Sequence, residues 1–319
     1  MRTIYVDNCS ERPAPCVATI GFFDGVHRGH RFLIDRVIAT ARDAGLESTV
    51  ITFDRHPRQV LHSDYIPQLL STFEMKLRLL AATAIDNCAV LRFDKRLARL
   101  SAREFMEYML RDRLNVRKLV IGYDNRFGHD RTEGFDDYVR YGRELGIEVV
   151  LSPVFVLDGL DLSSSLIRKL VTAGNITTAN RYLGYRYSIE GCVTGGFQEG
   201  RKMGFPTANI DLSESAQLVP GCGVYAVTAE VDHDGQQREG MMNIGMRPTF
   251  GGQTVTLEVN IFHFGANLYG RTLTVTFADR IREERKFNDT TALARQLAKD
   301  QQQIERQFEK EKEHEKSSC

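Results

Sequence analysis

The character of the sequence changes near Gly184, and this change limits the fold more than any other feature. Upstream of it, short apolar runs typical of strands alternate with stretches whose apolar residues recur at helical spacing. Residues 16–23, 31–41 and 48–53 form the first strand, helix and strand of this pattern. Because parallel strands are joined by helical crossovers, the alternation predicts an α/β domain with a parallel sheet covered by helices on both faces.

Downstream of Tyr187 the sequence consists of short β-like runs separated by glycine-containing turns, at residues 187–194, 223–231, 238–245, 254–262 and 271–278. The residues DHDGQQ, 232–237, are typical of a hairpin connection. Closely spaced short strands predict a compact antiparallel barrel or sandwich. A helix is expected from Thr290 and Thr291, and the charged residues 306–319 predict a solvated tail without structure.

The length of 319 residues agrees with two domains, since about 150 residues per domain is usual. We place them at residues 1–185 and 186–305, with the tail at 306–319. The 42 basic and 42 acidic side chains leave no net charge, which argues against binding to nucleic acid or membrane surfaces. The expected partners are therefore small molecules, and the sequence leaves the oligomeric state open.

The six cysteines are scattered and include no C-x-x-C pair. This pattern is typical of reduced thiols in a cytoplasmic protein and contains no zinc motif. The first 15 residues have no apolar core of a signal peptide, and no run is long enough to span a bilayer. We expect a soluble, cytoplasmic protein.

The stretch GFFDGVHRGH, residues 21–30, combines three glycines with His27 and His30 where a strand gives way to a helix. The glycines allow a tight turn and a close approach of a ligand, and a helix N-terminus attracts phosphate. The two imidazoles would add N–H donors toward the same anion. An ordinary exposed turn is the plain alternative, and a zinc site is a weaker one because no third ligand lies nearby.

Two further stretches could bind phosphate. LSSSLIR, residues 162–168, places Ser163, Ser164 and Arg168 at the start of a short helix, although serines there are usually only caps. GGFQEGRKMGFPTANI, residues 195–210, is rich in glycine but lacks the Walker A pattern and does not lead into a helix. By itself it is a long hairpin loop.

The first half of the chain resembles the nucleotidylyltransferases with an H-x-G-H motif, and within them the FAD synthetases, through FDGVHRGH. Residues 52–61, 121–135 and 162–175 are similar to three further blocks of that family. The family usually has asparagine in place of Phe22, proline in place of Arg55 and threonine in place of Ser165. The resemblance implies a Rossmann-like sheet.

The resemblance also implies roles for individual residues. His27, His30 and Arg168 would stabilise the charge that develops at the α-phosphate of ATP. Other residues would hold ATP or its phosphates: Gly21, Phe23, Asp24, Gly25, Gly29, Ser163 and Ser164. A further group would lie near the flavin mononucleotide (FMN) or adenine pockets: Asn125, Arg126 and Phe127.

The second half resembles riboflavin kinases through GFPTAN, NIGMRPTF at residues 243–250 and TLEVNIFHF at 256–264. The resemblance implies that Thr207 and Asn209 bind Mg²⁺ and that Glu258 is the catalytic base, although a glutamate in an alternating strand is usually a surface residue. Asn260 departs from the histidine or aromatic residue common two positions after that glutamate. The nucleotide would lie on Gly195, Gly200, Arg201, Lys202 and Gly204, and the flavin on Arg282, Glu284 and Phe287.

Together the matching blocks reach residue 305 and resemble the prokaryotic bifunctional riboflavin kinase/FAD synthetases. Such an enzyme phosphorylates riboflavin with ATP and then adenylylates FMN with a second ATP, with Mg²⁺ as cofactor. Three alternatives stay open: a second domain that binds flavin but has lost kinase activity, a transferase acting on another phosphate such as phosphopantetheine, and a non-enzymatic nucleotide-binding regulator.

Overall fold

The computed structural model describes residues 1–8, 11–61, 68–123, 125–129, 132–195, 204–213, 215–249 and 252–317. These residues form two compact units, Met1–Ser164 and Ser165–Cys319. None of the helices in the described part of the chain has the length and apolar character needed to cross a bilayer.

The first unit is built on a sheet of six parallel strands in the order β1-β4-β3-β2-β5-β6. The strands are β1 (Arg2–Tyr5), β2 (Cys16–Ile20), β3 (Glu47–Phe53), β4 (Asn87–Leu91), β5 (Val116–Ile121) and β6 (Glu148–Leu151). The chain adds β3 and β4 on one side of β2, then β5 and β6 on the other. Such a reversal of strand order opens a crevice at the carboxyl ends of the central strands, where ligands of α/β folds bind.

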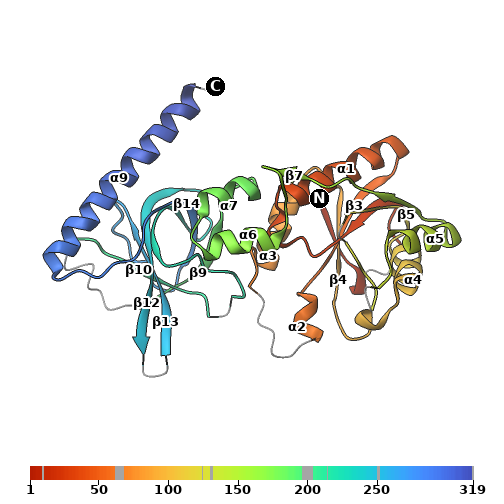
Figure 1. The fold of residues 1–319 in the computed structure, drawn as a ribbon, viewed down its shortest axis with the longest axis horizontal. Coiled ribbons are helices and arrows are strands. Elements are labelled where there is room, and N and C mark those ends of the chain that lie inside the picture. Colours follow the sequence, from red (N-terminus) through yellow and green to blue (C-terminus); the bar gives the residue numbers. More distant parts are fainter. Residues whose placement is uncertain are drawn as a thin grey trace. The chain divides into compact units, whose positions relative to one another are not determined.

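Helices cover both faces of this sheet, as the alternating sequence predicts (Figure 1). On one face, α1 (Arg28–Ala44) and α3 (Phe73–Ala81) pack Ile34, Val37 and Leu80 onto the strands. The other face is covered by α4 (Ala102–Phe105), the π-helical segment η4 (Met106–Arg113) and α5 (Phe135–Leu145), which pack their own apolar side chains onto the strands. The smaller elements are α2 (Pro57–Leu61), two other short helical segments, Val6–Asn8 and Leu97–Arg99, and a hairpin of β7 (Val156–Leu157) and β8 (Leu160–Asp161).

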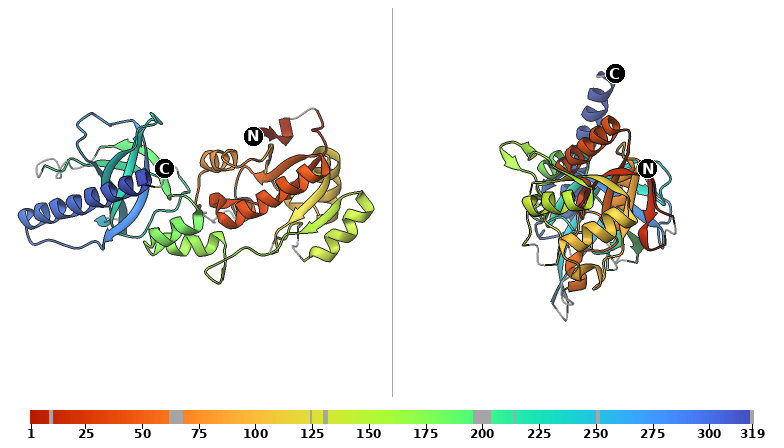
Figure 2. Two further views of the ribbon diagram at one scale, coloured as in Figure 1. Left: turned by 90° about the horizontal axis from the view of Figure 1, so that it is seen from above. Right: turned by 90° about the vertical axis from the view of Figure 1, so that its right-hand side faces the viewer.

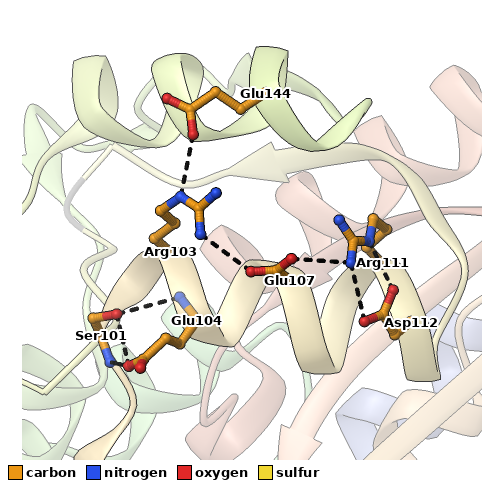
Figure 3. A network of polar contacts seen from close by, with 7 residues as sticks. All are labelled: Ser101, Arg103, Glu104, Glu107, Arg111, Asp112 and Glu144. Atoms are coloured by element: carbon orange, nitrogen blue, oxygen red, sulfur yellow. Dashed lines mark hydrogen bonds and ion pairs between the residues drawn. The ribbon is translucent and has the colours of Figure 1, made fainter.

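Local hydrogen bonds fix the starts of these helices. Ser101 and Glu104 form the capping box that begins α4 (Figure 3). Ion pairs of Arg103 with Glu107 and Glu144 then tie this stretch to α5. At α3, by contrast, the cap is Thr72, whose hydroxyl accepts from the Met75 amide at 3.1 Å. The Ser-x-x-Glu spacing, which predicts the cap of α4, also occurs at Ser71 and Glu74 and predicts Ser71 as the cap of α3. The Ser71 hydroxyl instead accepts from the amide of Gly25.

The second unit is built on a closed antiparallel barrel with the strand order β10-β13-β12-β11-β14-β9. Its strands are β9 (Ser188–Thr194), β10 (Ala208–Asp211), β11 (Gly223–Val231), β12 (Arg238–Thr249), β13 (Gly252–Ile261) and β14 (Thr272–Arg282). The pairing of β9 with β10 closes the ring, so that no edge is left unpaired. The expected hairpin at 232–237 joins β11 to β12.

Helices α6 (Ser164–Thr172) and α7 (Ile176–Leu183) fall within the second unit except for the first residue of α6. Asn180 of α7 donates to the carbonyl of Phe277 at 2.9 Å, and the Thr177 hydroxyl donates to Asp279 at 2.6 Å. The two units therefore divide between Ser164 and Ser165. The change in sequence pattern suggests a boundary later in the chain, at residue 185. Apolar spacing reveals a helix but does not say which core the helix joins.

The barrel is followed by one long helix, α9 (Thr290–Ser317), which lies along it (Figures 1 and 2). Ile304 and Phe308 are buried against Val224 and Met241 of the barrel wall. These contacts cover apolar surface on the outside of strands β11 and β12. The helix is thus part of the domain and not an appendage.

The expectation of an unstructured tail at 306–319 is wrong as far as Ser317, where the described helix ends. Beyond Phe308 the helix is held by ion pairs of Glu311 with Arg186 at 2.7 Å and of Lys312 with Glu239 at 2.5 Å. The alternating Glu and Lys residues also place opposite charges three positions apart on the helix, as with Glu309 and Lys312, which supports it further. A charged composition alone does not distinguish such a helix from a solvated chain.

Two candidate active sites

The turn between β2 and α1 carries the predicted histidine site. Strand β2 ends at Ile20 and not at Phe23, and a short helical turn at Asp24–Val26 precedes α1. Phe23, Gly25 and Val26 have positive φ angles of 55°, 73° and 36°. Glycine accepts this conformation readily, whereas a buried valine there is strained. The surrounding core holds the turn in a shape that it would not adopt by itself.

The two histidines lie together at the N-terminus of α1. His27 is the N-cap, and its Nδ1 accepts from the backbone N–H of His30 at 3.3 Å. The rings stack with their centroids 3.7 Å apart, and Phe23 packs edge-on against His30 at 5.1 Å. Because Nδ1 of His27 is an acceptor, the proton of its neutral ring is on Nε2.

Burial holds the pKa of His30 well below its usual value of 6.5, and the nearby His27 and Lys76 lower this pKa further. His30 is therefore neutral at physiological pH. Its Nδ1 is buried and has no hydrogen-bond partner among the described residues. An unpaired polar atom at the end of a strand and the start of a helix is suited to bind a ligand.

Two predicted ATP-binding residues serve the turn itself. The carboxylate of Asp24 accepts from the amides of Leu70 and Ser71 at 2.8 and 3.3 Å, and its carbonyl accepts from the Ser164 hydroxyl at 3.0 Å. The Ser71 hydroxyl accepts from the amide of Gly25 at 3.1 Å. Asp24 is buried, and its carboxylate already accepts hydrogen bonds from the protein backbone. Ser164 ties the start of α6 to the turn. Their expected contacts with ATP stay predictions.

The block at residues 121–135 begins at the end of β5, the strand paired with β2. Asn125 donates to the carbonyl of Ile20, the last residue of β2. Arg126 is exposed. Phe127 packs in the core, stacked on Tyr138 with ring centroids 4.2 Å apart, and its expected place beside the flavin or adenine stays a prediction. Its large apolar ring is as suited to a core as to a ligand pocket, so the sequence alone could not separate the two.

The remaining phosphate-binding predictions lie in or beside the histidine turn and at the start of α6. Gly21 and Gly29 have ordinary φ angles, and a Cβ on Gly29 would crowd the His27 ring at 3.2 Å. Ser163 directly precedes α6, and Arg168 lies on α6 with its guanidinium donating to Ser165 at 3.1 Å. The glycine at position 29 thus leaves room for the histidine pair.

A cavity of about 270 Å³ in the second unit is the other candidate site. Glu258 of β13 lines it together with Thr207, which directly precedes β10. The three predicted flavin contacts also line it: Arg282, Glu284 and Phe287. The structure thus brings the predicted base, one predicted metal ligand and the flavin contacts to one cavity.

Strand register places Glu258 in a polar row. It pairs with Asn209 of β10 on one side and with Asn243 of β12 on the other. Side chains opposite one another on neighbouring strands lie about 5 Å apart at their Cβ atoms. Asn260, on the same strand, donates to the carbonyl of Pro206 at 2.6 Å and so holds the segment that carries Thr207. The row thus places the amide groups of two asparagines beside the carboxylate of Glu258.

The end of β14 is tied to α9 by an ion pair with a buried carboxylate. Arg282 donates to Asp300 at 2.9 Å, and Asp300 is only 2% exposed. Gln296 donates to the other carboxylate oxygen at 2.6 Å and accepts from Arg285. Arg282 and Arg285 both lie over the Phe287 ring, 5.6 and 5.0 Å from its centroid. This network holds the side of the cavity that carries the predicted flavin contacts.

Part of the predicted nucleotide loop lies outside the described residues, namely Gly200, Arg201 and Lys202. Gly195 directly follows β9 and is exposed, and Gly204 has a φ of 83° before the strand β10. Glycine is the residue that adopts such an angle without strain. The two described glycines therefore mark the ends of the loop.

Comparison with protein families assigns both units. Residues 9–166 match the model of the FAD synthetase family, and residues 183–308 match that of the riboflavin kinase family. A bifunctional riboflavin kinase/FMN adenylyltransferase of Pseudomonas fluorescens is 40% identical over 87% of this chain and 88% of its own length. The chain belongs to this bifunctional family.

Other relatives of the family match over similar lengths. The Escherichia coli K12 protein of the same name is 37% identical over 93% of this chain and 94% of its own. The Bacillus subtilis protein is 35% identical over 97% and 98%. The agreement therefore extends through both units.

A solved structure from Streptococcus pneumoniae, described as a macrolide-efflux protein, has a TM-score of 0.84 and 31% identity to this chain. It covers 95% of this chain and 98% of its own length. The reference to efflux concerns that protein alone. For this chain the comparison supports the same succession of an α/β unit and a barrel.

The sequence analysis did not single out two residues at these sites. Lys76 is buried on α3, although its position gave a signal: it shares one helix face with Phe73 and Leu80, where an apolar residue is expected. Asn243 lines the barrel cavity opposite Glu258. Only the strand register reveals that neighbour, because the two residues are far apart in the chain.

Proposed function

We propose that this chain makes FAD from riboflavin in two steps, one at each site. In the barrel, the 5′-hydroxyl of riboflavin attacks the γ-phosphate of ATP, which gives FMN and ADP. In the α/β unit, the phosphate of FMN attacks the α-phosphate of a second ATP, which gives FAD and pyrophosphate. The observation that carries this proposal is that each family match falls on a unit with its own polar site.

The kinase step has to remove a proton from a neutral hydroxyl. Glu258 faces the cavity and is the carboxylate that we assign as general base. Arg282, Glu284 and Phe287 lie in the same cavity and would orient the flavin. A Cβ on Gly245 would overlap the Glu284 carboxylate, so the glycine on β12 allows Glu284 to approach the strand. The cavity thus offers charged groups and an aromatic ring for the flavin beside the assigned base.

Mg²⁺ fits the donor set near Glu258. The Thr207 hydroxyl and the Asn209 amide oxygen are hard neutral ligands, which Mg²⁺ accepts alongside phosphate oxygens and water. When bound, the ion would neutralise charge on the ATP phosphates. Thr207 and Asn209 would hold the nucleotide in place through it. Gly195 and Gly204, with Gly200, Arg201 and Lys202 between them, would contribute backbone N–H groups and positive charge to the phosphates.

The adenylyl step needs no base, because the phosphate of FMN is already an anion. It needs donors fixed at the place where charge increases in the transition state. His27 and the neutral His30, at the N-terminus of α1, would be such donors. Ser163, Ser164 and Arg168 would add hydroxyl and guanidinium contacts to the phosphates. Asn125 and Arg126 would lie beside the bound nucleotide or flavin.

We place the enzyme in the cytoplasm, where ATP is abundant. Cys16, Cys88, Cys192 and Cys222 are free thiols, as expected for a reducing compartment. Incubation with riboflavin, ATP and Mg²⁺, followed by separation of the flavins over time, tests the whole proposal. FMN should appear first and FAD later. If only added FMN is converted, the barrel binds flavin without kinase activity; if neither product forms, the proposal is wrong.

A further inference from the structure

Lys76 is a buried cation that the reaction described above does not use. Its side chain is 2% exposed on α3, in the α/β unit. The ammonium donates to the carbonyl of Phe22 at 3.2 Å, to the Thr52 hydroxyl at 3.2 Å and to the carbonyl of Phe53 at 2.9 Å. An ammonium group has three hydrogens, so its donors are fully used within the protein.

These acceptors belong to the carboxyl ends of two neighbouring strands. Phe53 is the last residue of β3, and Phe22 lies just after β2 in the turn that leads to His27. The Thr52 hydroxyl also donates to the Phe22 carbonyl, at 3.1 Å. Lys76 therefore binds the start of the histidine turn to the end of the next strand. The clamp uses the backbone of residue 22 and not its side chain.

No carboxylate lies within ion-pair distance of Lys76 in the described ranges of the chain. Its charge is stabilised by the three dipoles and by the Phe22 and Phe73 rings, whose centroids lie 4.2 and 5.3 Å from Nζ. A buried lysine without a carboxylate partner is costly, and an apolar side chain in the same place would cost less. A buried lysine at this cost, beside the turn that carries the histidine pair, indicates a role in that site.

The charge of Lys76 also acts on the histidine pair. Burial lowers the pKa of Lys76 to about 8, and its positive charge adds to the effects that keep His30 neutral. The groups that face the ammonium from the neighbouring elements are Asp24, Asp54 and Cys88. The two carboxylates favour its protonated form, whereas burial raises the pKa of the Cys88 thiol to about 11 and keeps it neutral near pH 8. The protonated ammonium thus holds the turn through its hydrogen bonds and helps to keep His30 neutral.

We propose that Lys76 is a positioning residue for adenylyl transfer: by clamping the Phe22 carbonyl to the end of β3, it fixes the turn that aims His27 and His30 at the nucleotide. This rests on the function proposed for the α/β site. Lys76 itself touches no substrate. Loss of its proton removes one of three donors, and the turn loosens.

The test compares Lys76→Met with Lys118→Met in the full chain. Lys118 is the matched control, a lysine of the same sheet that pairs with Glu148 near the surface. We expect kcat for FAD formation to fall about 10²-fold in K76M, the loss typical of a displaced catalytic group, with KM for FMN unchanged. Hydrogen exchange at the amides of β2 on the same preparation reports folding of the α/β unit and should match the wild type. Riboflavin phosphorylation, assigned to the other unit, should keep its wild-type rate, as should both activities of K118M.

The pH profile separates positioning from packing. FAD formation by the wild type should decline as pH rises through about 8, where Lys76 loses its proton, while this limb should be absent from K76M. If K76M does not fold, Lys76→Gln, which keeps two N–H donors without the charge, takes its place. Equal FAD formation by wild type and variant, or an alkaline limb that persists in the variant, overturns the proposal. A wild type that forms no FAD overturns the proposed function as well.

Discussion

The histidine pair of the α/β unit lies in a strained turn that the protein holds from several sides, whereas Glu258 lies on the wall of a cavity among cross-strand neighbours. At the first site the hydrogen bonds are made to the backbone of the turn. At the second they tie the cavity side to α9. We infer that the difference follows from the nucleophile. An anionic phosphate needs fixed donors, and a neutral hydroxyl needs a carboxylate base.

The largest effect should come from Glu258→Gln. Riboflavin phosphorylation should fall about 10²- to 10⁴-fold, because the amide cannot accept the hydroxyl proton. Adenylylation of added FMN should be unchanged, since that step involves no base. Both rates are measured by separating the flavins after timed incubation. Glu190→Gln, on β9 outside the cavity, is the control. A kinase rate within a few-fold of wild type would remove Glu258 from the chemistry.

The reverse pattern is expected when both histidines are changed to alanine. Each preorganised donor is worth roughly 10²- to 10³-fold in rate, so FAD formation should nearly cease while FMN still accumulates. The rate at which FAD forms from added FMN and ATP is measured, and His263→Ala in the second unit is the control. FAD formation at the wild-type rate would show that the pair is an ordinary turn.

The ion pair under the barrel cavity should contribute to stability. Asp300→Ala leaves Arg282, whose side chain is 17% exposed, without its partner. Breaking a buried pair costs about 3–5 kcal/mol, and we expect the lower end because Arg282 can reach some solvent. Hydrogen exchange at the amides of β14 measures the free energy of opening of this unit. Glu144→Ala, which breaks the exposed pair with Arg103 in Figure 3, should have far less effect on its own unit, measured at the amides of β5. Equal effects would contradict the comparison.

The smallest effect concerns pH. The folded pKa of His30 lies below the unfolded value of 6.5, so the unfolded chain binds more protons as pH falls below 6.5. The free energy of unfolding of the α/β unit should therefore decrease on acidification, by at most about 1.4 kcal/mol per pH unit for one proton. Hydrogen exchange at the amides of β2 follows this loss. In His30→Gln the slope just below pH 6.5 should be smaller. An unchanged slope would show that His30 is not buried as a neutral ring.

Several features could be predicted because they are written in local patterns. The alternation of apolar runs predicts the parallel sheet, the glycine-separated runs after Tyr187 predict the barrel strands, and Ser101 with Glu104 predicts the cap of α4. Such signals depend on period and on neighbours within one or two turns. The histidine turn belongs to this class as well, although β2 ends earlier than its apolar run suggests.

Other features depend on which segments meet. The sequence by itself determined the two kinds of domain, the chemistry that His27, His30 and Glu258 can offer, and the order of the elements along the chain. Only the tertiary structure decided that Phe127 packs in the core and that Lys76 is buried under the turn. Burial and hydrogen-bond partners come from contacts between segments far apart in the chain. A side chain's type limits what it can do, but its surroundings decide whether it packs, holds a turn or meets a substrate.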